Sequence, residues 1–245
     1  MKSSYRTRLY SHYGHDFQDA GEVFDVKTAQ RWGKAQTYRL RNWLPDSKDV
    51  KIIDLACGGG KLLNFFKGNG YNNLQGIDIS PDQVSLSRQV VPDVLQGNIL
   101  EHLRNSPATY DLITAYDIIE HFHKDEVLDF LDGCYAALKP NGRLVLQTCN
   151  ADSPWGTMHR YGDFTHEVSF NPNVLSRLLK LVGFQMTEAR EAGPVPWGYS
   201  LTCTMRFLMW QLFRAWFILW NLVETGSKGD GVFTRIFLTT GIKGN

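Results

Sequence analysis

Two carboxylates and one histidine lie close together in a short stretch near the middle of the chain. Asp117, Glu120 and His121 fall within about one helical turn, so their side chains converge if the segment turns. Carboxylate oxygens with one imidazole form a ligand set that suits Mg²⁺, Mn²⁺ or Zn²⁺. His121 is also a candidate to act directly on a bound acceptor. The alternative is purely structural: a helix cap at Asp117 and a Glu–His pair that holds the loop.

A second polar stretch, residues 155–167, contains two more histidines and two carboxylates. We predict that His166 is the general base, because a neutral imidazole titrates near working pH. Asp163 is predicted to orient this imidazole, or to bind acceptor hydroxyls together with Arg160 and Tyr161. The alternative is a plain turn whose side chains bond to the backbone.

A glycine-rich corner precedes both stretches. Residues 50–56 are mostly apolar or β-branched, as in a strand buried on both faces of a parallel sheet. Three glycines, residues 58–60, and an apolar helical pattern follow, which predicts a helix N-terminus aimed at a nucleotide. Leu63 stands where the dinucleotide fingerprint G-x-G-x-x-G requires its third glycine, so that class of cofactor is excluded. Asp54, just before the glycines, suits a cationic amino-acid head instead.

The corner sequence D-L-A-C-G-G-G resembles the first motif of class I S-adenosylmethionine (SAM)-dependent methyltransferases, D/E-x-G-x-G-x-G, with Ala56 in place of the first glycine. The turn L-K-P-N-G-R-L, residues 138–144, resembles the turn that introduces the fifth strand in that family. The resemblance implies SAM as cofactor and a Rossmann-like α/β fold, with a seven-stranded, mostly parallel sheet and helices on both faces. The residues it assigns to SAM are Asp54, Ala56, Cys57, Gly58, Gly60, Asp78, Ile79, Asn98 and Ile99.

Two of these positions can also be predicted from where strands end. Asp78 ends the predicted second strand, roughly 20 residues past the glycines, where an acidic side chain accepts hydrogen bonds from a ribose diol. Its alternative role is to cap the helix that starts near Pro81. Asn98 ends the predicted third strand, and the resemblance implies that its carbonyl oxygen contacts the adenine amino group.

Two further resemblances concern the acceptor. The stretch from Asp117 to His121 is similar to the acidic motif of the ubiquinone-biosynthesis O-methyltransferases, where it is associated with a divalent cation. R-Y-x-D-x-T-H, residues 160–166, resembles methyltransferases found with bacterial polysaccharide and O-antigen synthesis genes. The resemblance implies O-methylation of a sugar hydroxyl on a lipid- or nucleotide-linked glycan. The alternatives are a polyprenylated phenol in quinone synthesis, and a catalytically silent SAM-binding partner protein at the membrane.

Alternating strand and helix patterns over the 245 residues predict a single domain. We expect an N-terminal cap at residues 1–48 and substrate- or membrane-facing insertions at 150–171 and 193–231. The formal net charge of +1 offers no basic surface for nucleic acid. Four scattered cysteines without a C-x-x-C pair, and an N-terminus without an apolar core, predict a reduced, cytoplasmic protein.

The segment that begins at Ser200 and ends at Glu224 contains three of the seven tryptophans. Its apolar run is shorter than the ~20 residues that a spanning helix needs, and Gln211 and Arg214 interrupt it. Plotted as a helix, its polar residues share one side and most of its large apolar residues share the other. We therefore predict a helix in the membrane interface, a homodimer helix or a core helix. The first of these makes the protein peripheral on the inner face of the membrane.

Overall fold

The computed structural model of the chain describes residues 22–196 and 200–245, so the first 21 residues of the predicted cap lie outside the described residues. Within them, one sheet has the strand order β3-β2-β1-β4-β5-β7-β6. β7 runs antiparallel to both β5 and β6, and the other neighbours pair in parallel. The strands are β1 (Ile52–Leu55), β2 (Leu74–Asp78), β3 (Val94–Gln96), β4 (Tyr110–Tyr116), β5 (Leu138–Cys149), β6 (Gln185–Glu191) and β7 (Ile236–Ile242). The predicted seven-stranded, mostly parallel sheet is confirmed.

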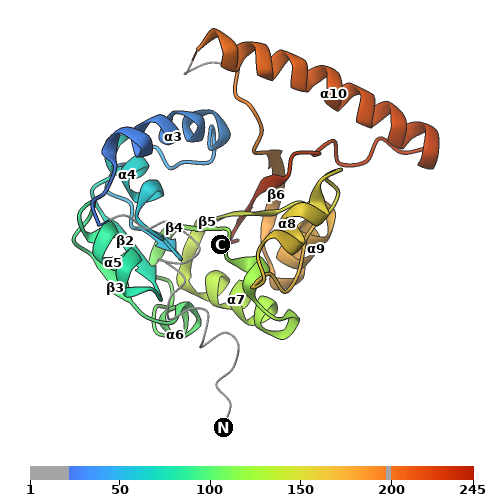
Figure 1. Ribbon diagram of the computed structural model, residues 1–245. Coiled ribbons are helices and arrows are strands. Elements are labelled where there is room, and N and C mark those ends of the chain that lie inside the picture. Colours follow the sequence, from blue (N-terminus) through green and yellow to red (C-terminus); the bar gives the residue numbers. More distant parts are fainter. Residues whose placement is uncertain (1–21, 197–199) are drawn as a thin grey trace.

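Helices cover both faces of this sheet (Figure 1). They are α3 (Val26–Arg39), α4 (Lys61–Gly68), α5 (Pro81–Arg88), α6 (Ile99–Arg104), α7 (Lys124–Ala137), α8 (Gly156–Gly162), α9 (Pro172–Val182) and α10 (Leu201–Thr225), with a 3₁₀ turn, η1 (Ile119–His121). Ile52 belongs to an apolar cluster with α4 and α5, whereas the next residue, Ile53, belongs to a cluster with α6, α7 and α9. Because successive side chains of this strand are both buried, its sequence is the unbroken apolar run described above.

Most predicted elements are present, and four differ. β3 stops at Gln96, two residues before its predicted end, because Asn98 starts α6, a helix that the sequence pattern did not indicate. β5 begins at Leu138 and so includes the predicted turn. The sequence pattern predicts the last strand from Val232, but β7 begins four residues later, at Ile236. The predicted insertion at residues 150–171 contains a short helix, α8.

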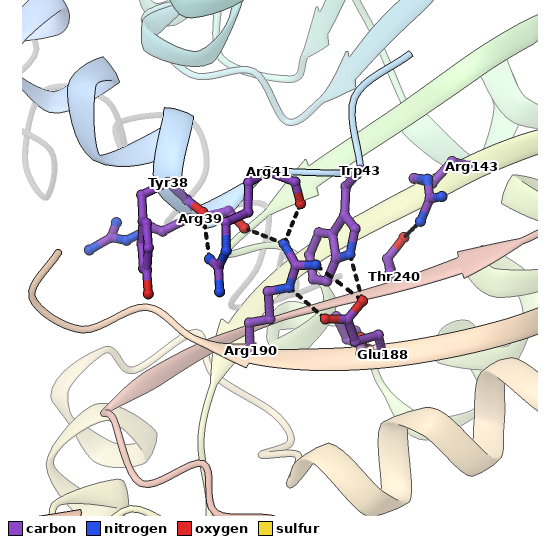
Figure 2. A network of polar contacts seen from close by, with 9 residues as sticks. Tyr38, Arg39, Arg41, Trp43, Arg143, Glu188, Arg190 and Thr240 are labelled. Atoms are coloured by element: carbon purple, nitrogen blue, oxygen red, sulfur yellow. Dashed lines mark hydrogen bonds and ion pairs between the residues drawn. The ribbon is translucent and has the colours of Figure 1, made fainter. Parts of the chain in front are cut away.

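The segment after α3 is fastened to the edge strand β6 (Figure 2). The indole of Trp43 donates a hydrogen bond to Glu188 over 2.9 Å, and Arg190 donates to the same carboxylate. The guanidinium of Arg190 stacks 4.0 Å from the centre of the Trp43 ring and donates to the carbonyls of Arg39 and Arg41. This network fixes the end of α3 on the sheet.

The long helix α10 lies at one edge of the molecule, with the body of the domain on one side only (Figure 1). None of its residues is buried. Among the described residues, no helix is long and apolar enough to cross a membrane.

Candidate active site

The glycine corner between β1 and α4 is built from left-handed backbone positions. Ala56, Gly58 and Gly60 have φ angles of 54°, 50° and 84°. Glycine adopts this conformation without steric cost, whereas alanine is strained by its Cβ atom. The turn lies where the strand order reverses between β1 and β4, the place where open α/β sheets bind ligands.

The glycines of the corner have separate roles. Gly58 and Gly59 line the cleft in front of the turn. Gly60, which we predicted to contact the cofactor, does not line the cleft. A Cβ atom there would lie 3.1 Å from the Cα atom of Ser87, so Gly60 allows the turn to pack closely on α5. Cys57 lines the cleft as predicted, and burial holds the pKa of its thiol well above its ordinary value.

Asp54 is buried at the end of β1, yet it lines the cleft. The hydroxyl of Thr114 on the neighbouring strand donates a hydrogen bond to its carboxylate over 2.7 Å. Burial raises the pKa of Asp54 from its ordinary 3.8 to about 7, and the nearby charge of Asp78 acts in the same direction. A bound cation would therefore stabilise the ionised form of this carboxyl, which suits the ammonium group of an amino-acid ligand.

Asp78 connects the glycine turn to the start of α5. Its two carboxylate oxygens accept hydrogen bonds from the backbone N–H groups of Gly58 and Ser80, each over 2.9 Å. Since a carboxylate offers about four acceptor positions, it can hold this corner and still accept bonds from a ribose diol. Ile79 follows with 54% of its surface exposed, and it lines the cleft as an apolar platform.

Asn98 lies at the same mouth, but its side-chain oxygen already has partners. That oxygen accepts hydrogen bonds from the N–H groups of Leu100 and Glu101 and caps α6. The prediction that this carbonyl binds the adenine amino group is therefore corrected, because the cap uses the acceptor. Asn98 and Ile99 both line the cleft at this point.

The cleft has a volume of about 1420 Å³ and extends from the glycine corner to the predicted acceptor residues. This exceeds the roughly 300–1,000 Å³ typical of pockets for one small ligand, so the cleft has room for a cofactor and an acceptor together. Several residues that line it are not among the predicted site residues, because they come from distant segments: Phe24, Thr28 and Trp32 around α3, Gln83 on α5, Tyr116 on β4 and Gln147 on β5.

His121 and His166 meet at the far end of the cleft, with ring centres 4.7 Å apart. Thr165 donates its hydroxyl proton to the Asp163 carboxylate over 2.7 Å, so the same hydroxyl accepts the hydrogen bond from Nδ1 of His121, 2.9 Å away. Nδ1 of His166 donates to the carbonyl of His159 over 2.7 Å. Both rings, when neutral, therefore carry their lone pair on Nε2, the nitrogen that can accept a proton. Asp163 orients His121 through Thr165, not His166 as predicted.

The predicted metal ligands Asp117, Glu120 and His121 do not converge. Asp117 accepts a hydrogen bond from the amide of Gln147 over 2.9 Å. Glu120 turns into the interior, where Thr148 donates to it over 2.8 Å, and burial followed by the charge of Asp117 raises its pKa to about 8. Its backbone carbonyl accepts from residues 167 and 168, so Glu120 holds the loop in place.

Two other groups bring potential ligand atoms within 4.8 Å of one another among the described residues. One contains His121, Asp163 and His166, and the other contains Glu120, Cys149 and His166. Two imidazoles and one carboxylate match a common cation site, so the first group is the one that fits a divalent ion.

Arg160 and Tyr161, predicted to bind the acceptor, do not line the cleft. The guanidinium of Arg160 donates to the carbonyls of His166 and Glu167 and closes the loop around the histidine. Tyr161 is 78% exposed on α8. A role for Arg160 in placing His166 replaces the predicted role in binding.

The sheet order with its single antiparallel strand, the left-handed glycine corner at the switch point and the acidic residues ending β1 and β2 define a class I SAM-dependent methyltransferase. The chain belongs to the family described as "Methyltransferase domain", which it matches over residues 28–189. This membership confirms the predicted class and favours an enzyme over a catalytically silent partner.

Known proteins agree with this class. The chain is 32% identical over 121 residues to the mitochondrial ubiquinone biosynthesis O-methyltransferase of Schizosaccharomyces pombe, which covers 46% of the chain and 42% of that protein. It is 25% identical over 171 residues to a ubiquinone biosynthesis O-methyltransferase of Xylella fastidiosa, covering 60% and 66%. The chain thus spans less than two thirds of the length of these two relatives.

Among solved structures, a SAM-dependent methyltransferase from Archaeoglobus fulgidus superposes with a TM-score of 0.63 at 19% identity, over 86% of this chain and 94% of that one. Phosphoethanolamine N-methyltransferase 2 of Haemonchus contortus, in complex with SAM, gives 0.64 at 14% identity, over 99% and 60%. These similarities establish the fold.

Proposed function

We propose that the protein transfers the SAM methyl group to a sugar hydroxyl of a lipid- or nucleotide-linked glycan in bacterial surface polysaccharide synthesis. When bound, SAM supplies a methyl group on a positively charged sulfur. An alkyl hydroxyl is a weak nucleophile and must lose its proton to a base as it reacts. The observation that carries the proposal is the pair of imidazoles at the acceptor end of the cleft. Their hydrogen bonds engage Nδ1 and leave Nε2 as the basic nitrogen of each ring.

Gln147 adds a second argument for a hydroxyl acceptor. Its amide nitrogen donates to Asp117, while its buried side-chain oxygen lacks a hydrogen-bond partner within the described structure. A buried acceptor without a donor is costly, and this one belongs to a residue that lines the cleft. A ligand hydroxyl that donates to Gln147 would remove that cost.

The second candidate is O-methylation of a polyprenylated phenol. The names of the curated relatives support it, and so do Ile118 and Phe122, apolar residues that line the same end of the cleft. A phenol ionises near pH 10 and needs less help from a base than a sugar hydroxyl does. The polar surroundings formed by Asp117, Gln147 and the two histidines favour the sugar.

A divalent cation is the alternative to proton transfer at the two histidines. His121, Asp163 and His166 are the residues that would hold it. A cation there would occupy the Nε2 lone pairs that proton transfer requires, so the two roles exclude each other. We expect the histidines to act as bases.

The test is transfer of radiolabelled methyl groups from SAM to lipid-linked glycans extracted from bacteria, with a polyprenylated phenol as the competing acceptor. We expect His166→Ala to lower turnover on the glycan by about a hundredfold or more, as loss of a general base does, with SAM affinity retained. His102→Gln is the matched control, since His102 bonds to Tyr110 outside the cleft. Methylation of the phenol alone would overturn the sugar proposal, and full activity of His166→Ala would overturn the assignment of the base.

A further inference from the structure

The helix α10 attaches to the domain through a side that carries both polar and aromatic residues. The indole of Trp210 donates to the carboxylate of Glu191 at the end of β6 over 2.8 Å, and Arg214 donates to the carbonyl of Gly231 over 2.8 Å. On the same side the ring of Phe217 lies 5.4 Å from that of Phe233. These contacts fix which side of the helix faces the protein.

The opposite side of α10 is apolar and exposed along the whole helix. An ordinary surface helix exposes its polar residues, whereas this helix exposes large apolar side chains. With 25 residues, the helix presents this face over about 37 Å. A continuous apolar surface of this extent marks an interaction site. Side chains at least half exposed there include Leu208, Leu212, Trp216, Leu219, Trp220 and Val223.

The width of this face distinguishes between occupants. A helix from a second copy would bury one seam of residues spaced three and four apart, here Leu208, Leu212, Trp216, Leu219 and Val223. Met209, Phe213 and Trp220, 50%, 52% and 59% exposed, lie beside that seam and would stay in water. A flat lipid surface takes up both seams, and tryptophan is enriched at the level of the headgroups.

Positive charge lies beside the start of the apolar face. Lys27, Arg31 and Lys34 are exposed along one side of α3 and line a shallow hollow together with Ser200, the cap residue of α10. Each basic residue near an anionic membrane contributes to binding, so this cluster complements acidic headgroups. The other side of α3, with Trp32, lines the cleft. The helix that carries the charges therefore also forms a wall of the active site.

We propose that α10 lies in the interface of an anionic membrane, with its apolar face in the outer acyl region and the cluster of Lys27, Arg31 and Lys34 on the headgroups. The cleft is then held beside the bilayer. The proposal concerns where the enzyme works, and it holds whichever hydroxyl is methylated.

The test is co-sedimentation of the full chain with vesicles of phosphatidylcholine alone and with added phosphatidylglycerol. We expect the double variant Leu212→Glu/Leu219→Glu to bind vesicles about tenfold or more weakly, because each leucine loses its burial. Leu181→Glu, at an equally exposed leucine on α9, is the matched control and keeps wild-type binding. Phosphatidylglycerol should increase vesicle binding by the wild type. Replacing the three basic residues by glutamine should remove only this increase, and high salt should have the same effect.

The same variants should keep their SAM affinity and their rate of methyl transfer to a water-soluble acceptor. This measurement separates membrane binding from the proposed choice of acceptor. Wild-type protein that stays in the supernatant with both vesicles overturns the proposal, as does equal sedimentation of the double variant. Analytical ultracentrifugation tests whether a second copy of the chain covers the apolar face instead. If the wild type is a dimer that Leu212→Glu dissociates, and the wild type does not bind vesicles, the face is a dimer interface.

Discussion

Replacement of Asp54 by asparagine should change both stability and cofactor binding, in opposite directions. Burial raises the pKa of this carboxyl from 3.8 to about 7. The folded protein therefore keeps a proton that the unfolded chain releases between these two pH values. Because the unfolded chain loses the proton first, the free energy of unfolding falls as the pH rises through this window and is level above pH 7.

The magnitude follows from the width of the window. At 1.36 kcal/mol for each pH unit, the raised pKa of Asp54 lowers the stability at pH 8 by about 4 kcal/mol relative to pH 3, and by about 2 kcal/mol between pH 5 and 7. Asparagine has nearly the same shape, accepts the same bond from Thr114 and does not titrate. We therefore expect the stability difference between Asp54→Asn and wild type to grow by about 2 kcal/mol between pH 5 and 7.

Urea unfolding of the two proteins without cofactor, followed by tryptophan fluorescence at several pH values, measures this difference. Titration calorimetry with SAM should show the opposite effect, with affinity about tenfold weaker in Asp54→Asn at pH 7.5, because a charge-assisted hydrogen bond is lost. Asp111→Asn, at the other end of the sheet beside Lys51, is the control for affinity and should bind SAM normally. Parallel pH profiles of stability would refute the raised pKa. Unchanged SAM affinity would refute the role of Asp54 in binding.

Three other changes test other parts of the site. Ala56→Gly should leave stability unchanged or raise it by up to about 1 kcal/mol, because it relieves the left-handed backbone at φ 54° but adds chain entropy on unfolding. The control Ala115→Gly, in the ordinary backbone of β4, should lower stability in the same urea assay. Equal losses of stability in the two variants would contradict a strained backbone at Ala56. Gln147→Met should raise the KM for the acceptor by about tenfold and leave SAM affinity unchanged; an unchanged KM would separate Gln147 from the acceptor. Dialysis against a chelator should leave turnover unchanged if His121 and His166 act as bases, whereas a loss that Mg²⁺ restores would assign them to a cation.

The cofactor half of the site could be predicted because its parts are local. A buried strand, a tight turn and a helix lie within residues 50–68, and their conformations follow from glycine content and apolar spacing. The same locality explains the bounds of α9: Asn171 caps its first turn and Gly183 ends it in a left-handed conformation. Asn98 is the counterexample, since a cap and a strand end both suit asparagine and only the structure shows which role it has.

The acceptor half depends on contacts between distant segments, which a sequence pattern does not contain. Glu120 looked like a metal ligand, but β5 supplies Thr148 and Cys149 as its partners, and they draw its carboxyl away from the cleft. Gln147 gave no signal, because its importance comes from an oxygen that the fold buries without a donor. The charged side chain of Arg160 is typical of a binding residue, but in the structure it closes its own loop.

The orientation of α10 shows the same limit and adds a physical consequence. Amphipathic spacing separates the two sides of a helix, and the usual expectation is that the apolar side faces the protein. Here Glu191 and the backbone at Gly231 bind Trp210 and Arg214, so the protein contacts the side of the helix that carries these two residues. The side with most of the large apolar residues stays exposed, which in water alone would be unfavourable. The membrane binding proposed for α10 would cover this side, because a lipid surface takes up a broad apolar face.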